Sequence, residues 1–587
     1  MKLNISLLLL LLLLGCVTKK EDATLVKRPN IVLIMADDQG WGDLSISGNS
    51  NLSTPNIDAL AQNGVSFENF YVQPVCSPTR AELLCGRQFQ RLGVYATSAG
   101  GERLNLNETT LAEVFKMAGY QTAVYGKWHN GMQPPYHPNT RGFDDFYGFA
   151  SGHWGNYFDP LIEHNGKLVK GKGFLVDDLT NRAMEFITKN KKKPFLLYLP
   201  YNTPHSPMQV PYTYWNKFKD KELTKKHRDT AIEDPNFTRA ALAMVENIDT
   251  NVGRIINKLR ELNLEENTII VYLSDNGPNG WRWNGGMRGK KGSIDEGGVR
   301  SPLFISWKNT IPASKNVTQI ASAIDILPTL AGLAGIEVKT LKPLDGLNMQ
   351  PLIFEEKPSW EPRYIYNHWN EKTSVRSQEF RLDDENRLYH IPSDLGQTKD
   401  VSKNYPEVYT SLLNAKENWL QEVPKSSAYN RPFTIGHPDI ETTQLPARDG
   451  IAHGNIKRSN QYPNCSFFTN WKSLEDSITW DTEVLSDGDY EVLLFYSCTE
   501  ENVGSTLLLE FESSNLSKKI TKSHDPPLQG MENDRTPRIE SYIKDFKPIS
   551  MGIIKLKKGK GQLTLRASEI TGEEFIDFRL LLFNKLN

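Results

Sequence analysis

Acidic residues follow two apolar segments that the sequence predicts to be buried strands. Asp37 and Asp38 come directly after the run from Asn30 to Ala36, and Asp275 and Asn276 come after a second such run. Adjacent carboxylates repel each other, so keeping both ionised at a strand end requires a nearby cation. Taken alone, the first pair also fits a helix cap or a turn. Together with the second pair, its oxygen donors predict a hard metal ion, Ca²⁺ or Mg²⁺.

A second candidate for chemistry is Cys76, in the segment Cys76-Ser77-Pro78-Thr79-Arg80. The residues that follow continue in helical register to Arg87, and proline suits the first turn of a helix. Cys76 is therefore predicted at a helix N-terminus, where backbone N–H groups favour anions. A cysteine in that place is ordinarily either a buried hydrophobe or a reactive thiol.

At this motif the sequence resembles the type I sulfatases. Their Cys-x-Pro-x-Arg signature matches Cys76 to Arg80 and continues here to Leu84-Cys85-Gly86-Arg87, where Cys85 replaces the threonine of most relatives. Further segments resemble family landmarks in the family's order, over roughly residues 28 to 423. They are Gly126-Lys127-Trp128-His129, Thr203-Pro204-His205, Arg288 to Pro302 with Lys291 as the matching lysine, and a looser match from Leu388 to Val401.

The resemblance implies that Cys76 is converted before export to Cα-formylglycine (3-oxoalanine), whose hydrated aldehyde is the nucleophile, and that a formylglycine-installing maturase is a partner. It implies that Arg80 steadies this group, that Lys127 and Lys291 neutralise sulfate oxygens, and that Asp275 also accepts a proton. His205, with Lys291, would protonate the leaving oxygen, and His129 would remove a proton from the second hydroxyl to expel sulfate. The implied ligands of the metal, Ca²⁺ in preference to Mg²⁺, are Asp37, Asp38, the modified Cys76, Asp275 and Asn276.

Two loops carry candidate substrate residues: His153 and Trp154 lie in one, and Arg282 lies just after the metal pair. Aromatic faces with interspersed polar groups suit sugar rings, although packed loop residues fit equally well. The resemblance to secreted bacterial polysaccharide sulfatases favours a sulfated algal or host polysaccharide. Ulvan is a leading candidate for the substrate, and fragments of carrageenan, fucoidan and glycosaminoglycans are the alternatives. The alternatives are a phosphodiesterase or phosphonate hydrolase of the same superfamily, and a non-catalytic glycan-binding lipoprotein.

Composition and patterning predict the fold that must position these residues. With 587 residues, 39% hydrophobic and 24% charged, the chain is neither disordered nor a multi-span membrane protein. A formal net charge of −2 gives no basic surface for nucleic acid. Buried strands alternate with amphipathic helices, and Thr110 with Glu113 forms a predicted capping box. The predicted class is α/β, a mainly parallel sheet with helices on both faces, which the resemblance makes alkaline-phosphatase-like.

The chain divides into five predicted segments. Residues 1–15 form a signal peptide with a leucine core too short to span a bilayer, and Cys16 completes a lipobox-like sequence. We therefore expect an exported protein, attached by a lipid anchor alone, in the periplasm or at the outer membrane or cell surface. Four further segments follow: a catalytic domain (28–359), a small α+β subdomain (360–423), a linker (424–450) and an accessory β-sandwich (451–587). In the sandwich, Cys465 and Cys498 either form a disulfide or remain buried thiols. The domain either binds carbohydrate or buttresses the active site, and we favour the buttressing role.

Overall fold

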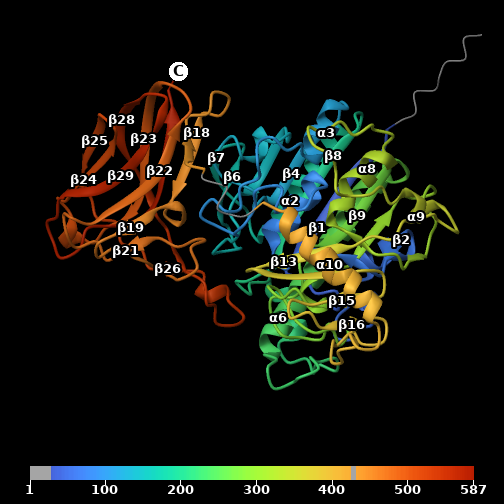
Figure 1. Ribbon diagram of the computed structural model, residues 1–587. Helices are drawn as coiled ribbons and strands as arrows, with labels where there is room; N and C mark the ends of the chain where they lie inside the picture. Colours follow the sequence, from blue (N-terminus) through green and yellow to red (C-terminus); the bar gives the residue numbers. More distant parts are fainter. Residues whose placement is uncertain (1–27, 425–430, 587) are drawn as a thin grey trace, which may run out of the picture.

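A computed structural model of the protein describes residues 28–424 and 431–586 (Figure 1). The predicted signal peptide and the lipidation site at Cys16 lie outside the described residues. Within those residues, no helix combines the length and the apolar character needed to cross a bilayer.

The catalytic domain is built on a ten-stranded sheet with the order β11-β2-β10-β9-β1-β8-β4-β5-β6-β7. The central strands β9, β1, β8, β4 and β5 are parallel, whereas β10, β6 and β7 run antiparallel to their neighbours. The strands are β1 (Asn30–Asp37), β2 (Val65–Phe67), β4 (Gln121–Lys127), β5 (Asp145–Phe149), β6 (Leu161–His164), β7 (Lys167–Lys170), β8 (Phe195–Pro204), β9 (Thr268–Ser274), β10 (Leu303–Ser306) and β11 (Lys315–Val317). The mainly parallel sheet is thus confirmed, with antiparallel strands toward its edges.

Helices cover both faces of this sheet, which explains why the sequence of strand β1 is continuously apolar. Ile31, Leu33 and Met35 face one core, and Val32 and Ile34 face the other, because successive side chains alternate across a strand. The first core includes residues of α2 (Cys76–Cys85), α3 (Leu111–Met117), α8 (Ile326–Leu333) and α9 (Gln350–Phe354); the second includes residues of α1 (Pro55–Gln62), α4 (Leu175–Asn190), α5 (Tyr212–Phe218) and α6 (Pro235–Glu261). The predicted capping box of Thr110 and Glu113 is present at the start of α3.

The predicted α+β subdomain is a four-stranded antiparallel sheet with one helix against it. Its elements are β13 (Ile365–Trp369), β14 (Lys372–Arg376), β15 (Phe380–Leu382), β16 (Leu388–His390) and α10 (Pro406–Glu422). Leu412 of the helix packs against Val375 and Leu382 of the sheet. Asn367 donates a hydrogen bond to the backbone of Val72 at 2.8 Å, which ties the subdomain to the chain just before Cys76.

The C-terminal part consists of two mainly antiparallel sheets around one apolar core (Figure 1). One sheet has the order β17-β22-β29-β24-β25 with β19 on β22, and the other β20-β21-β30-β23-β28 with β18 on β30. The elements are β17 (Phe433–Ile435), β18 (Thr442–Pro446), β19 (Ile451–His453), β20 (Lys457–Arg458), β21 (Phe468–Thr469), β22 (Ser477–Val484), β23 (Gly488–Ser497), β24 (Thr506–Phe511), β25 (Ser514–Lys519), β28 (Lys547–Leu556), β29 (Gly559–Glu569), β30 (Asp577–Lys585) and the separate pair β26 (Leu528–Gln529) and β27 (Ile543–Lys544).

One expectation about this region needs correction. The segment 424–450 is not simply a linker, because β17 and β18 pair with β22 and β30 and so belong to the two sheets. These strands are too short, and too rich in turn residues around them, for periodicity to reveal them. The sequence leaves open whether Cys465 and Cys498 pair, and in the structure both are buried free thiols. Burial raises the pKa of the Cys498 thiol to about 11, so this thiol stays protonated near neutrality.

Candidate active site

The two acidic clusters meet because their strands are neighbours in parallel register. Ala36 of β1 lies opposite Ser274 of β9, so the residues that follow both strands emerge at one edge of the sheet. The backbone N–H of Asp38 donates to Asp275 at 3.1 Å, and Asp38 has a φ of 67°. This left-handed turn directs the Asp38 side chain away from the strand direction, toward the cavity that it lines.

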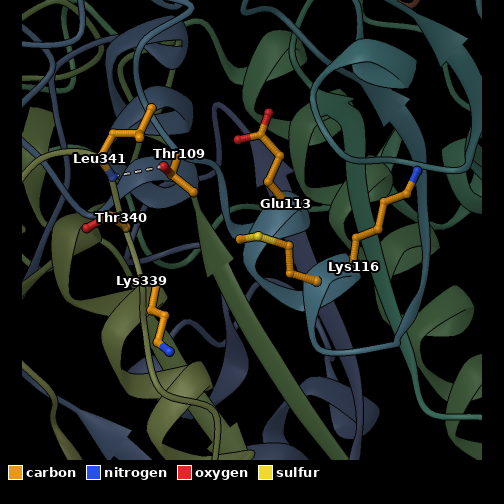
Figure 2. Close-up of a pocket in the computed structure, with 7 residues that line it drawn as sticks. Thr109, Glu113, Lys116, Lys339, Thr340 and Leu341 are labelled. Carbon is orange, nitrogen blue, oxygen red and sulfur yellow. Dashed lines mark hydrogen bonds between the residues drawn. The ribbon is translucent and has the colours of Figure 1, made fainter.

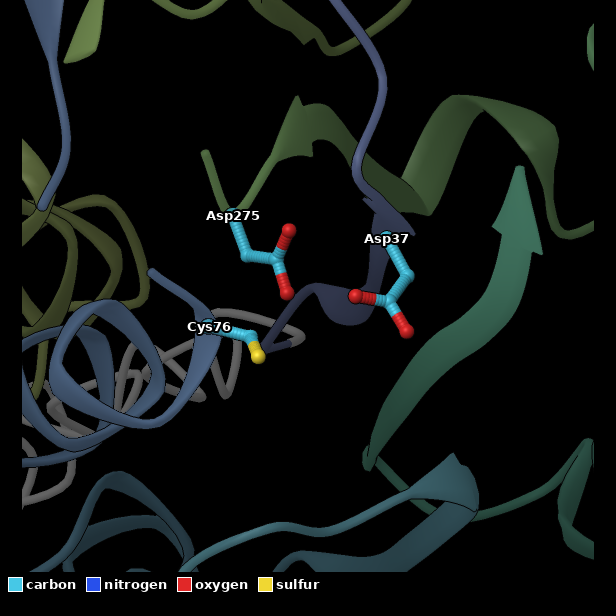
Figure 3. A group of neighbouring side chains, drawn as sticks. All are labelled: Asp37, Cys76 and Asp275. Carbon is cyan, nitrogen blue, oxygen red and sulfur yellow. The ribbon is translucent and has the colours of Figure 1, made fainter. Parts of the chain in front are cut away.

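Cys76 lies beside these carboxylates at the first residue of α2. One oxygen of Asp37, one of Asp275 and the sulfur of Cys76 all lie within 4.8 Å of one another. Figure 3 shows the three side chains pointing toward a common point from β1, α2 and the end of β9. Val75, the residue before the helix, is extended, so the helix begins at Cys76 and the backbone N–H groups of its first turn have no partner within the helix.

Three cations neutralise the carboxylates. Lys127 donates to both oxygens of Asp37 at 2.8 and 3.0 Å, and Lys291 approaches those of Asp38 at 2.8 and 2.9 Å. Arg80 donates to Asp275 at 2.6 and 3.1 Å. Burial by itself would raise the pKa of Asp37 and of Asp38, but the neighbouring lysines and His205 hold both pKa values below the usual range. Both carboxylates are therefore ionised at neutral pH.

Asn276 tests whether this donor set fits a metal ion. Its Nδ2 donates to Asp38 at 2.8 Å, whereas its Oδ1 is buried with no hydrogen-bond partner among the described residues. A buried acceptor without a donor is unfavourable unless something else satisfies it. An amide oxygen and several carboxylates are suitable ligands for a hard divalent cation, and Asp37 and Asp275 each place an oxygen within 4.8 Å of the other and of the Cys76 sulfur, so the residues present fit such an ion.

The two histidines differ in which ring nitrogen is free. His129 follows β4 with a φ of 62°, and its Nε2 donates to the Thr97 carbonyl at 2.8 Å. Its Nδ1 is buried and unpartnered among the described residues, so the neutral ring keeps a free lone pair there. Burial, and then the charge of Lys127, hold the pKa of His129 well below its usual value. Gly152 must be glycine here because a Cβ would lie 2.2 Å from the His129 Nε2.

His205 follows β8 and has the opposite arrangement. Its Nδ1 donates to the Ser206 carbonyl at 2.6 Å, and its Nε2 lies 3.6 Å from an oxygen of Asp38. The Nε2 atom is therefore the one available to exchange a proton with a substrate. His205, His129, Lys291, Asp38 and Cys76 all line one cavity of about 520 Å³.

Only one of the three predicted substrate residues lines this cavity. His153 does, with its ring centroid 5.4 Å from that of His205. Trp154 instead stacks on Phe149 of β5 at 5.3 Å and packs against the core. Arg282 is buried, and its guanidinium binds the Asp43 carboxylate at 2.6 to 3.0 Å. In the structure Trp154 packs against the core and Arg282 pairs with a buried carboxylate. The loop sequences alone did not distinguish these roles from substrate contact.

Comparison with known proteins identifies this arrangement. Residues 29–336 match the family model described as Sulfatase. N-acetylgalactosamine-6-sulfatase of Mus musculus is 32% identical over 374 residues, which cover 58% of this chain and 68% of that protein. Arylsulfatase G of Rattus norvegicus is 33% identical over 387 residues, covering 56% and 70%. The chain belongs to the sulfatase family. It is a sulfuric ester hydrolase.

Solved structures agree with this assignment. The sulfatase described here resembles the crystal structure of Ps i-CgsB with a TM-score of 0.62 and 33% identity, covering 68% of this chain and 94% of that one. The phosphonate monoester hydrolase of Agrobacterium radiobacter, at 20% identity and a TM-score of 0.53, shares the fold. The alkaline-phosphatase-like class predicted from the sequence is confirmed.

Sequence reasoning missed several residues that line the sulfatase cavity. Phe237 lies at the start of α6, Asn279 follows the metal pair, and Trp369 ends β13. None of them has a charge or motif that would have indicated a site. Loops of the C-terminal region contribute another part of the wall: Tyr462, Asn464, Pro537, Arg538, Ile539 and Glu540.

A second cavity, of about 600 Å³, lies elsewhere on the sulfatase (Figure 2). It is formed by one face of α3 and the segment around Leu341. The exposed side chains of Met117 and Leu341 contribute much of its apolar surface. No residue of the catalytic cluster lines it, so it is separate from the reaction site.

Replacing Arg282 with methionine is expected to destabilise the sulfatase by about 3–5 kcal/mol, because it leaves the buried carboxylate of Asp43 unpaired. Chemical denaturation followed by circular dichroism measures the effect. The double variant Asp43→Asn/Arg282→Met should recover part of the loss. A stable Arg282→Met protein with only a raised KM would instead support substrate contact.

The stability of the sulfatase should fall as the pH drops below about 6.5, in part because His153 is buried in its neutral form. Burial, and then the charge of His205, hold the pKa of His153 well below 6.5 in the folded state. The unfolded chain therefore takes up a proton that the native state does not, at a cost of about 1.4 kcal/mol per pH unit. Denaturation of wild type and of His153→Gln from pH 7.5 to 5 should give a shallower slope for the variant. Equal slopes would contradict the neutral assignment.

Proposed function

We propose that this sulfatase hydrolyses sulfate esters of a sulfated oligosaccharide or polysaccharide, with a formylglycine made from Cys76 and a bound divalent cation. The observation that carries the proposal is the position of Cys76. It begins a helix, lies within 4.8 Å of a carboxylate oxygen from each acidic strand end, and lines a cavity with basic side chains and three histidines. A structure of the similar Ps i-CgsB is named as a complex with k-i-k-neocarrahexaose, and a similar sulfatase is named for N-acetylgalactosamine 6-sulfate, which supports a carbohydrate substrate.

The cation would be held by the oxygens of the acidic strand ends and by the modified side chain of residue 76. When bound, a divalent ion polarises a sulfate oxygen and lowers the pKa of a hydroxyl group beside it. Several carboxylates and an amide oxygen suit the larger, more flexible coordination of Ca²⁺ better than the strict octahedron of Mg²⁺. The proposed ligands are Asp37, Asp38, Asp275, Asn276 and residue 76.

The chain's own cations would bind the sulfate group. Lys127 is buried and contacts Asp37, which lies beside Cys76, and the partly buried Lys291 contacts Asp38. Their charges therefore act where water screens them less. Charge that builds up on the sulfate oxygens in the transition state would be stabilised there. Arg80 holds Asp275 in place through two hydrogen bonds and so fixes the geometry around residue 76.

The two histidines would handle the protons. His205 Nε2 would donate to the leaving oxygen of the sugar, since its Nδ1 is already committed to a backbone carbonyl. His129 would act as a base through Nδ1, because its Nε2 is fixed by Thr97 and its ring is neutral at pH 7. This division of roles needs a neutral imidazole at residue 129, and the burial of that ring beside Lys127 favours its neutral form.

A panel of substrates tests the proposal. Release of sulfate would be measured on 4-nitrophenyl sulfate, N-acetylgalactosamine 6-sulfate and oligosaccharides of ulvan, carrageenan, fucoidan and glycosaminoglycans. We expect at least one saccharide to be hydrolysed with a higher kcat/KM than the aryl ester. Faster hydrolysis of a matched phosphate ester would favour a phosphodiesterase or phosphonate hydrolase. Binding without any turnover would favour a glycan-binding lipoprotein. Export, with a lipid anchor at Cys16 as the membrane attachment, remains part of this proposal because such polymers lie outside the cell.

A further inference from the structure

A loop of the C-terminal sheets forms one wall of the active-site cavity. The short pair β26 and β27 encloses the segment 530–542, and Arg538, Ile539 and Glu540 of this segment line the cavity together with His205 and Lys291. The C-terminal region is therefore in contact with the space where the substrate reacts, and it does more than support the catalytic domain from behind.

The loop is held in place by polar contacts with the catalytic domain. Arg538 is fully buried, pairs with Asp534 and donates to the Gly155 carbonyl at 2.6 Å. Gln209 donates to Asp534 at 2.9 Å, and Arg535 donates to the Val210 carbonyl at 2.7 Å. Buried charge-assisted hydrogen bonds of this kind give a fixed geometry. The position of Glu540 at the cavity is thus determined by the fold.

Two polar side chains at this wall have atoms without partners among the described residues. Glu540 accepts a hydrogen bond from the Ser206 hydroxyl through Oε1, while its Oε2 is buried and unpartnered. His153 is 4% exposed, and neither of its ring nitrogens has a partner. Glu540 and His153 both lie close to His205, the proposed acid for the leaving group. Ser206, the partner of Glu540, follows His205 in the chain, and the ring centroids of His153 and His205 are 5.4 Å apart.

We propose that Glu540 and His153 bind hydroxyl groups of the sugar that carries the sulfate ester, which makes Glu540 a specificity-determining residue supplied by the C-terminal region. This rests on the proposed function. A buried carboxylate oxygen needs a donor, and a neutral imidazole needs one donor and one acceptor. A sugar hydroxyl offers both, whereas an aryl group offers neither. The negative charge of Glu540 also disfavours a second sulfate or a carboxylate at this position, so the sugar presents a free hydroxyl here.

The test compares two substrates in each protein. Wild type, Glu540→Gln and Glu540→Ala would be assayed on 4-nitrophenyl sulfate and on the panel saccharide with the highest kcat/KM. Loss of a hydrogen bond to a charged group lowers affinity about ten- to a hundred-fold. We expect the ratio of kcat/KM for the saccharide to that for the aryl ester to fall by about that factor in Glu540→Ala, and less in Glu540→Gln, which retains an acceptor. Glu573→Gln, an exposed acidic residue of the same region that does not line the cavity, should keep the wild-type ratio.

Two further measurements separate the possible outcomes. Thermal unfolding of each variant shows whether the loop remains in place. If Glu540→Ala unfolds, Glu540→Gln still tests the inference, because it keeps the side-chain volume. Isothermal titration with the desulfated saccharide measures sugar binding without turnover, so it decides the role of Glu540 even if the wild type releases no sulfate and the proposed function fails. An unchanged ratio, or unchanged binding of the desulfated saccharide in folded variants, overturns the inference.

Discussion

Replacing Cys76 with serine is expected to reduce kcat/KM for sulfate ester hydrolysis by a factor of about 10⁴ or more. Cys76 is the residue at which the helix N-terminus, the metal-fitting carboxylates and the basic side chains converge. A serine retains a single hydroxyl, and releasing sulfate from it would require a water molecule to attack a sulfated side chain. The hydrated aldehyde implied by the family resemblance has a second hydroxyl, which His129 would deprotonate in the proposed mechanism. The measurement is initial-rate sulfate release by purified protein made together with a maturase.

Intact-mass analysis and a matched cysteine variant complete this experiment. The wild type should show a mass change at Cys76 that corresponds to converting the –CH2–SH side chain into –CHO, which replaces sulfur by oxygen and removes two hydrogens. Cys85, at the other end of the same helix, is the control: it is 1% exposed, and burial raises its pKa so that it stays a protonated thiol. Cys85→Ala should therefore retain most of the activity. Full activity in Cys76→Ser would refute the assignment of the nucleophile.

Removal of divalent cations is expected to reduce the rate by at least about 10³-fold, since the proposed ion would supply charge stabilisation and activate the nucleophile. Calcium should restore the rate more completely than magnesium, because the donors are carboxylates and an amide on strand ends that do not impose an octahedron. The Oδ1 of Asn276, buried and without a hydrogen-bond partner among the described residues, is the observation that most directly supports such an ion. The measurement is activity after exhaustive chelation and after titration with each ion.

A stability measurement makes this prediction independent of turnover. Calcium at about one hundred times its dissociation constant should raise the free energy of unfolding of the chelated protein by about 2.7 kcal/mol. The same addition should have little effect on Asp38→Asn, which loses a proposed ligand, and its full effect on Asp525→Asn, a half-exposed carboxylate of the C-terminal region. Activity and stability that are both insensitive to chelation would contradict the metal site.

The role of the C-terminal region differs from the expectation that it only buttresses the active site. It does support the catalytic domain: Gln133 donates to Asp449 and Gln444 donates to Glu163, both at 2.9 Å. The thiol of Cys465 donates to the carbonyl of His153 at 3.1 Å, so it helps to hold the loop that carries a cavity residue. Glu540 and its neighbours add a direct contribution to the cavity wall.

Several elements were determined by the sequence itself. The apolar run of β1 predicts a strand buried on both faces because both of its side-chain sets face helices, and the capping box at Thr110 fixes the start of α3 through contacts three residues apart. The ordered motifs around Cys76, Lys127, His205 and Lys291 predicted the family because the chemistry of sulfate transfer restricts residue types at fixed local spacings. In each case the information lies within a few residues of the feature it predicts.

The tertiary structure decided what depends on partners distant in the chain. Trp154 and Arg282 have the composition of substrate residues, yet Phe149 and Asp43 satisfy them, and no local pattern shows which partner a side chain will meet. The strands β17 and β18 form only because β22 and β30 offer unpaired edges to them. Glu540 accepts a hydrogen bond from the hydroxyl of Ser206, which is more than 300 residues away in the chain. Its position at the active site therefore follows from the docking of one folded region on another.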